Sequence, residues 1–229
     1  MVLNISEFRR LRGVTLSSQI VAHIRAAIFA GELTPGDVLG SEPELAKQFG
    51  VSRMSIRDSL RTLEAMGLVD IKIGAKGGAT IAHGNSNRLV DSMAVQMVLL
   101  GVTRDQLLQA RAAIESMTAT LAAKRATEED LHKIRLLLEE AEAKLDDPHE
   151  SARLGEAFHL AVAEAAGNAV LTLQLKAVSD ALTNPNHLPD RNRAQHILDV
   201  HQSLFELIAA RDEQGARENM MDHVEHWIN

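Results

Sequence analysis

The stretch from Ser41 to Gly67 constrains the fold of this chain more than any other part, because it carries the start and stop signals of two successive helices. Ser41 and Glu44 have the spacing of a capping box, in which each side chain accepts a hydrogen bond from the other residue's backbone N–H. Gly50 suits the left-handed position that ends a helix. Ser52 can cap a second helix, which we expect to end at Gly67. Two helices joined by a tight, glycine-containing turn predict a helix-turn-helix.

The second of these helices carries two different stripes of side chains. The apolar stripe, which we expect to pack inward, consists of Ile56, Leu60 and Leu63. The other stripe repeats every four residues and consists of Arg53, Arg57 and Arg61. A row of arginines on one helix is more often a solvated face than a binding site. Here it lies on the second helix of a helix-turn-helix, where an arginine fork can read O6 and N7 of guanine, so DNA binding is favoured.

A β-hairpin is predicted directly after these helices. Residues 68–73 alternate between apolar and polar side chains, residues 74–78 are rich in glycine, and residues 79–82 return as a second strand. Such a wing would place Gly74 and Lys76 close to a phosphate or a groove of DNA. A helix capped by Thr15 precedes the whole arrangement.

Charge is distributed unevenly along the chain, whose net charge is −7. Residues 1–82 hold ten Lys and Arg against eight Asp and Glu, whereas residues 83–229 hold fourteen against twenty-three. Nine of the ten histidines also lie in the second part. A mildly basic module joined to an acidic one is typical of a nucleic-acid-binding domain with a partner domain, although charge alone does not distinguish this from chance.

The fold class predicted from these patterns is mainly α, with an N-terminal winged helix-turn-helix and a C-terminal all-α bundle. We expect the DNA-binding domain at residues 1–83, a linker at 84–87 and the helical domain at 88–229. Helix starts at Thr103 and Thr127 and breaks such as Gly101 divide the second part into six or seven helices. The chain has no cysteine and no apolar run that could span a bilayer, so we expect a cytoplasmic protein.

Three histidines lie on apolar faces of different predicted helices, at His159, His201 and His223. Inward-pointing neutral imidazoles can bind Zn²⁺, Ni²⁺ or Mn²⁺ and leave positions open for a ligand. The residues alone favour the plainer interpretation, in which each is a hydrogen-bonded core histidine. The absence of cysteine excludes thiolate ligands.

The N-terminal part resembles the winged helix-turn-helix of the GntR family of bacterial transcription regulators over residues 16–82. The motifs that carry the resemblance are G-x-L-x-P-G, L-x-S-E-x-E-L-A, G-V-S-R and R-x-x-L-x-x-L, followed by the wing. The resemblance implies that Arg53 and Arg57 read bases, and that the residues near phosphate or groove are Ser52, Ser55 and Gly74. Some members carry an arginine where this chain has Pro43, so a contact from that position is lost.

From about residue 88 to 229 the chain resembles the FCD effector domain of the FadR subfamily. The matching pieces are R-x-x-I-E at 111–115, L-A-A-K-R-A-T at 121–127, F-H at 158–159, A-G-N at 166–168, H-x-x-L-x-x-x-I from His201 and M-M-D-H-V around His223. The resemblance implies that His159, His201 and His223 bind a divalent metal. The acidic ligand usual in that family is replaced by Gly155, so Glu156, a water or an effector carboxylate would fill its place. Arg111 is a candidate to bind an effector carboxylate, or else an ion-pair partner of Glu115.

The function expected from both parts is that of a ligand-responsive transcription regulator, and a repressor rather than an activator. A homodimer would bind a palindromic operator, and a small organic acid would shift its affinity. We expect no enzymatic activity. Two alternatives stay open: a metalloenzyme that uses the three histidines to activate water, and an architectural DNA-binding protein without an effector.

Overall fold

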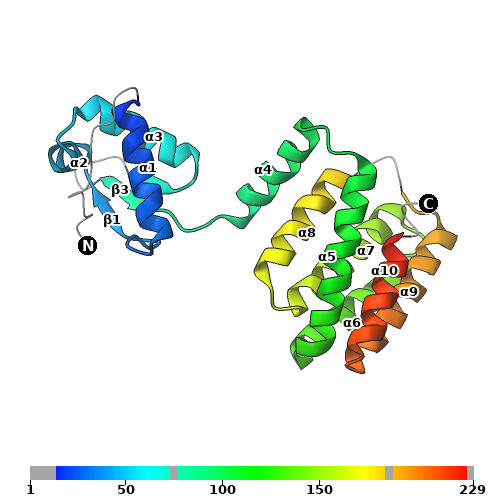
Figure 1. The fold of residues 1–229 in the computed structure, drawn as a ribbon. Helices are drawn as coiled ribbons and strands as arrows, with labels where there is room; N and C mark the ends of the chain where they lie inside the picture. Colours follow the sequence, from blue (N-terminus) through cyan, green and yellow to red (C-terminus); the bar gives the residue numbers. More distant parts are fainter. Residues whose placement is uncertain (1–13, 73–76, 184–187, 226–229) are drawn as a thin grey trace. The chain divides into compact units, whose positions relative to one another are not determined.

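A computed structural model describes residues 14–72, 77–183 and 188–225 of the chain. The chain divides into two compact units, one ending at Asn85 and the other beginning at Ser86 (Figure 1). Each unit has a hydrophobic core of its own.

The N-terminal unit is a three-helix domain with a small antiparallel sheet. Its elements are α1 (Leu16–Phe29), β1 (Val38–Gly40), α2 (Glu42–Phe49), α3 (Arg53–Ala65), β2 (Val69–Lys72) and β3 (Gly78–Ile81). The strands lie in the order β1-β3-β2, and Val69 pairs with Ile81. Strand β1 was not predicted from the sequence, whereas the hairpin of β2 and β3 was.

The helix signals of the N-terminal unit act as their chemistry predicts. Ser41 and Glu44 form the capping box, with a Glu44 carboxylate oxygen 2.8 Å from the Ser41 backbone nitrogen. Gly50 ends α2 in the left-handed conformation, with φ of 63°. Ser52 caps α3 by accepting a hydrogen bond from the Ser55 backbone. The apolar stripe of α3 is buried, as predicted, and Arg53 and Arg57 remain exposed.

The C-terminal unit is all-helical in its described residues, in agreement with the predicted bundle. Its helices are α4 (Ser86–Leu99), α5 (Arg104–Arg125), α6 (Glu128–Ala143), α7 (Pro148–Ala165), α8 (Ala169–Leu182), α9 (Arg191–Ala209) and α10 (Glu213–Glu225). Because α4 begins at Ser86, the second half of the predicted linker 84–87 belongs to a helix instead. Among the described residues, every helix is too short or too polar to span a lipid bilayer.

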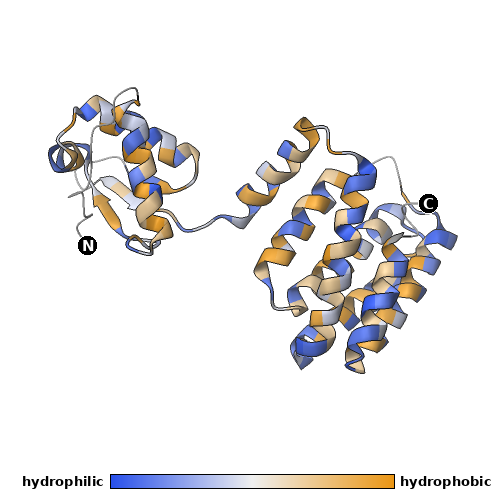
Figure 2. Ribbon diagram, in the orientation of Figure 1, coloured by the Kyte–Doolittle hydropathy of each residue, from blue (hydrophilic) through white to orange (hydrophobic). Residues whose placement is uncertain are grey.

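Helix α5 is the central element of the bundle and packs against α7, α8, α9 and α10 (Figure 1). Its middle is built from small residues, and Ala119, Ala122 and Ala123 are completely buried. Small side chains allow neighbouring backbones to approach closely, and Ala216 and Met220 of α10 belong to the same buried cluster. The exposed end of α4, in contrast, is strongly apolar (Figure 2).

Candidate functional site

The structure brings the three predicted histidines of the bundle together. His159 lies on α7, His201 on α9 and His223 on α10, and all three side chains are buried. The Nε2 atom of His201 lies 3.2 Å from Nε2 of His159 and 3.2 Å from Nε2 of His223. Phe158 stacks on the His201 ring with a centroid separation of 4.1 Å and restricts its orientation. Three helices therefore bring three imidazole rings together, with one candidate ligand atom of each within 4.8 Å of the others.

Hydrogen bonds among the rings cannot fully account for this convergence. An imidazole nitrogen carries either one proton or one lone pair, so Nε2 of His201 can make only one good in-plane hydrogen bond to its two close neighbours. A tetrahedral ion with Zn–N bonds of about 2.0–2.1 Å separates its ligand nitrogens by about 3.3 Å. The two separations that involve His201, both 3.2 Å, match that spacing, and the third pair lies within 4.8 Å. The three histidines thus fit a divalent metal ion better than they fit mutual hydrogen bonding.

A buried carboxylate orients the first of these histidines. Oε2 of Glu115, on α5, lies 2.9 Å from Nδ1 of His159, at ion-pair distance but without the alignment of a hydrogen bond, and the Glu115 side chain has no exposed surface. Burial raises the pKa of Glu115, but the charge of Arg111 and the contact with His159 outweigh it and lower the pKa to about 2. An ionised Glu115 favours the proton of His159 on Nδ1, which leaves the Nε2 lone pair available to a metal.

The other two imidazoles are held neutral by their surroundings. Burial lowers the pKa of His201 well below its usual value, and the neighbouring His159 and His223 lower it further. Burial also lowers the pKa of His223, to about 3. At neutral pH both imidazoles are therefore in the neutral form, which is the form that binds metal ions.

Arg111 lies at the edge of the site between two carboxylates. Its Nε atom is 2.8 Å from Glu115, the i+4 partner predicted for it, and its Nη2 atom is 2.9 Å from Glu156. Glu156, considered from the sequence as a replacement ligand, is thus engaged by Arg111 through one oxygen. Within the described residues its other oxygen, Oε1, is buried and has no hydrogen-bond partner.

A cavity of about 340 Å³ opens onto His159 and His201. Arg111, Gly155 and Glu156 line it, together with Ser179, whose buried hydroxyl also has no partner among the described residues. A Cβ atom added at Gly155 would lie 3.9 Å from Cε1 of His201, which is ordinary contact. The position that lacks the family's acidic residue therefore faces the histidine cluster, as the resemblance implied.

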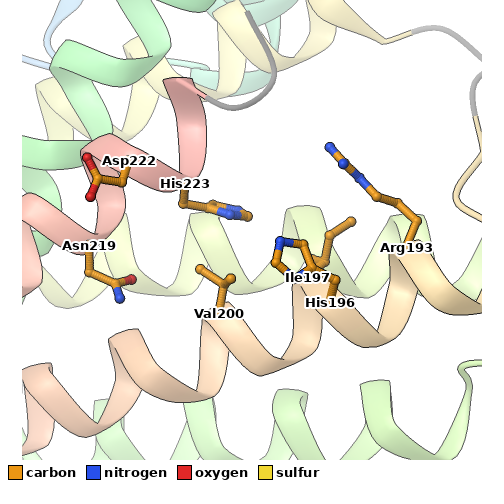
Figure 3. A pocket seen from close by; sticks show the side chains of 7 residues that line it. All are labelled: Arg193, His196, Ile197, Val200, Asn219, Asp222 and His223. Carbon is orange, nitrogen blue, oxygen red and sulfur yellow. The ribbon is translucent and has the colours of Figure 1, made fainter. Parts of the chain in front are cut away.

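A second cavity, of about 220 Å³, lies on the side of His223, between α9 and α10 (Figure 3). Ile197 lines both cavities and forms a common wall between them. Ile197 cannot be singled out from the sequence, because it is one of several apolar residues on a helix face.

The candidate DNA-binding residues lie around the start of α3. Arg53 is its first residue, and Ser52 and Ser55 form its N-terminal cap with hydroxyl groups 2.9 Å apart. Arg57, one turn further on, makes a two-pronged ion pair with Glu42 of α2, which sequence reasoning had not connected with it. The predicted wing residues Gly74 and Lys76 lie outside the described residues.

Comparison with known families identifies both parts of the chain. Residues 16–77 match the family described as bacterial regulatory proteins, gntR family. Residues 106–226 match the FCD domain and include the three histidines, Arg111 and Glu115.

Individual relatives match along nearly the whole chain. The chain is 33% identical over 220 residues to the putative L-lactate dehydrogenase operon regulatory protein of Escherichia coli, covering 91% of this chain and 83% of that protein. It is 31% identical over 201 residues to the transcriptional regulator LutR of Bacillus subtilis, covering 85% of this chain and 91% of that protein. The fold is similar to that of Streptococcus agalactiae GntR, with a TM-score of 0.59 at 20% identity, covering 93% of this chain and 98% of that one. These sequence relatives are regulators rather than enzymes.

Proposed function

Because the chain belongs to the gntR family of bacterial regulatory proteins and is a transcriptional regulator with an FCD effector domain, we propose that it is a repressor controlled by a small organic acid. In this proposal the acid binds at a divalent metal ion held by His159, His201 and His223. The observation that carries the proposal is the cluster of three buried histidines, in which Nε2 of His201 lies 3.2 Å from Nε2 of each of the other two and all candidate ligand atoms lie within 4.8 Å of one another. We expect the protein to act in the cytoplasm, on double-stranded DNA.

Three imidazole nitrogens favour Zn²⁺ or Ni²⁺ over Mg²⁺ or Ca²⁺, which prefer oxygen ligands, and Mn²⁺ would need further oxygen ligands from water or the acid. A bound ion would supply a positive charge and open coordination positions for an oxygen ligand. The residues around it supply the rest of the site: Glu115 holds His159 in the ligating tautomer, and Gly155 leaves space beside His201.

A small acid fits the cavity next to the histidines. The volume of this cavity, about 340 Å³, is at the low end of the range for small-molecule sites. The Ser179 hydroxyl and Glu156 Oε1 have no hydrogen-bond partner among the described residues. Both could accept a hydrogen bond from a hydroxyl group of a hydroxy acid. Arg111 supplies a guanidinium at the same wall, although Glu115 and Glu156 already neutralise it. The name of the E. coli relative, which refers to an L-lactate dehydrogenase operon, is consistent with a hydroxy acid.

A homodimer is proposed because one helix-turn-helix reads only half of a palindromic operator. Helix α4 offers a surface for a second copy of the chain, since Val95, Val98 and Leu99 are 56%, 62% and 73% exposed on adjacent turns. Sedimentation at micromolar concentration should give twice the chain mass of 25.0 kDa. A monomer under these conditions would contradict this part of the proposal.

The proposed function is tested by measuring operator binding with metal and acid varied separately. The operator is first selected from randomised duplex DNA with the Zn²⁺-loaded protein. A panel of short hydroxy acids and dicarboxylates is then added to metal-loaded and chelator-treated protein. We expect at least one acid to lower operator affinity only in the metal-loaded form. Indifference to every acid and metal would favour an architectural DNA-binding protein, and turnover of an acid would favour a metalloenzyme.

Replacing Gly155 by Asp is expected to raise metal affinity and to weaken the response to the acid. The new carboxylate would lie beside His201 and occupy the position proposed for the effector's own carboxylate. The matched control is Gly155→Ala, which fits the same space and removes a helix-interior glycine without adding a ligand. Metal titration with a competing chelator should give equal affinities for Gly155→Ala and wild type. Equal affinities for all three proteins would place the metal elsewhere.

Replacing Arg57 by Ala is expected to weaken operator binding by roughly tenfold to a hundredfold for each half-site, the effect of losing one bidentate guanine contact there. Base preference should be relaxed at one base pair in each half-site. Fluorescence anisotropy on operators with single base changes measures both effects. Unchanged base preference would contradict the assignment of Arg57 as a base-reading residue.

A further inference from the structure

We infer that Glu42 is a positioning residue for DNA recognition, which holds the Arg57 guanidinium so that its free edge faces a base. The inference rests on the proposed role of Arg57 in reading bases. Glu42 belongs to α2 and Arg57 to α3, so the contact joins the two helices of the helix-turn-helix.

The contact uses one edge of the guanidinium and leaves the other edge available. The Arg57 Nε atom donates to Glu42 Oε1 at 3.0 Å, and Arg57 Nη2 donates to Oε2 at 2.8 Å. A guanidinium has five N–H donors, and these two bonds engage two of them along its side. The remaining edge still offers parallel donors from Nη1 and Nη2. That edge is the one needed for a bidentate contact to O6 and N7 of guanine.

Glu42 is well placed to stay ionised and fixed. It is the first residue of α2, where the positive end of the helix dipole stabilises a carboxylate. Its hydrogen bonds to Arg57 lower its pKa, and the charges of Arg57, Arg61 and Arg53 lower it further. The Arg57 side chain is 49% exposed and that of Glu42 is 32% exposed, so DNA can reach the pair.

Two consequences follow for DNA binding. A guanidinium held in one orientation loses less conformational freedom when it binds a base, which favours the specific complex. A carboxylate near the DNA backbone repels the phosphate groups, and this repulsion weakens binding to every sequence alike. The first effect raises the ratio of operator affinity to non-specific affinity, whereas the second lowers both affinities and leaves their ratio unchanged.

The test compares Glu42→Gln and Glu42→Asp with wild type, using the full-length protein. The probes are a duplex selected from a randomised pool by the wild-type protein and a scrambled duplex of the same composition. Glu42→Gln removes the charge, and Glu42→Asp keeps the charge but shortens the reach to Arg57. The control is Glu32→Gln, which makes the same change in charge at an exposed residue that has no ion pair in the described part of the chain.

We expect both Glu42 variants to lower the specificity ratio by about tenfold, and to relax base preference at the same base pair as Arg57→Ala. Glu42→Gln should also bind the scrambled duplex more tightly than wild type, whereas Glu42→Asp should not. Glu32→Gln should leave the ratio and the base preference unchanged. Thermal melting of each variant verifies that the domain is folded.

Two results would overturn the inference. If Glu42→Gln raised affinity for both duplexes by the same factor, Glu42 would only compete with DNA for Arg57. If the base preference of both Glu42 variants matched wild type while Arg57→Ala lost it, Arg57 would need no positioning by Glu42. Unchanged preference in Arg57→Ala itself would instead overturn the base-reading role on which the inference rests.

Discussion

Replacing His201 by Ala is expected to abolish metal binding by this protein. The Nε2 atom of His201 is the one that lies within 3.2 Å of both other histidine nitrogens, so its loss leaves two ligands without their common neighbour. The loss of affinity should exceed the 10–100-fold that is typical of changes to residues behind the metal ligands. Metal content of untagged protein, measured by mass spectrometry, should fall from about one ion per chain to none.

The control for this variant is His132→Ala, which removes an exposed histidine of α6 and should leave the metal content unchanged. A second measurement uses stability, because a ligand that binds only the folded protein stabilises it by about 2.7 kcal/mol at a hundred times its Kd. Zn²⁺ should therefore raise the melting temperature of wild type but not of His201→Ala. If wild type took up no Zn²⁺, Ni²⁺ or Mn²⁺, the three residues would be core histidines. The proposal that an acid binds at a metal ion held by them would then be wrong.

Replacing Glu115 by Ala is expected to destabilise the helical bundle by about 3–5 kcal/mol, the usual cost of removing one partner from a buried ion pair. Glu115 is completely buried and contacts both Arg111 and His159. The removal of Glu115 leaves the partly buried Arg111 with Glu156 alone and leaves His159 Nδ1 without a carboxylate. Denaturant unfolding followed by circular dichroism, with a chelator present, measures this cost without any contribution from metal.

Two further variants show whether charge or volume is responsible. Glu115→Gln keeps the shape, so a similar loss of stability would assign the effect to charge. Glu140→Ala breaks an exposed ion pair with Arg153 and should cost less than about 1 kcal/mol. In metal titrations, Glu115→Gln should also lower affinity about 10–100-fold, because it weakens the orientation of His159. A stability loss below 1 kcal/mol for Glu115→Ala would mean that the bundle tolerates an unbalanced Arg111.

Local signals allowed most of the fold to be predicted, and non-local pairing accounts for what was missed. The caps at Ser41, Ser52 and Thr103 act within four residues of chain, so their geometry can be read from spacing. Strand β1 has only three residues, and it exists because Val38 pairs with Thr80 more than forty positions later. No periodicity in so short a segment indicates such a partner.

The same distinction applies to the candidate sites. Apolar spacing placed His159, His201 and His223 on inward faces, but it could not indicate that ring nitrogens of all three lie within 4.8 Å of one another. That convergence depends on how the helices of the bundle pack. Nothing in the local spacing singles out Glu42, because its partner Arg57 lies fifteen residues away on another helix. Side-chain contacts between helices depend on how the helices pack, so they cannot be predicted from the spacing of residues along the chain.

The close packing of α10 on the alanines of α5 has a consequence for the order in which the protein becomes functional. His223 lies on α10, 22 positions after His201 and 64 after His159 in the chain. The cluster therefore exists only after this last described helix has been synthesised and has docked on α5. The N-terminal unit leaves the ribosome much earlier and has a core of its own. During translation, a nascent chain thus has its DNA-reading helix before it has the three-histidine site.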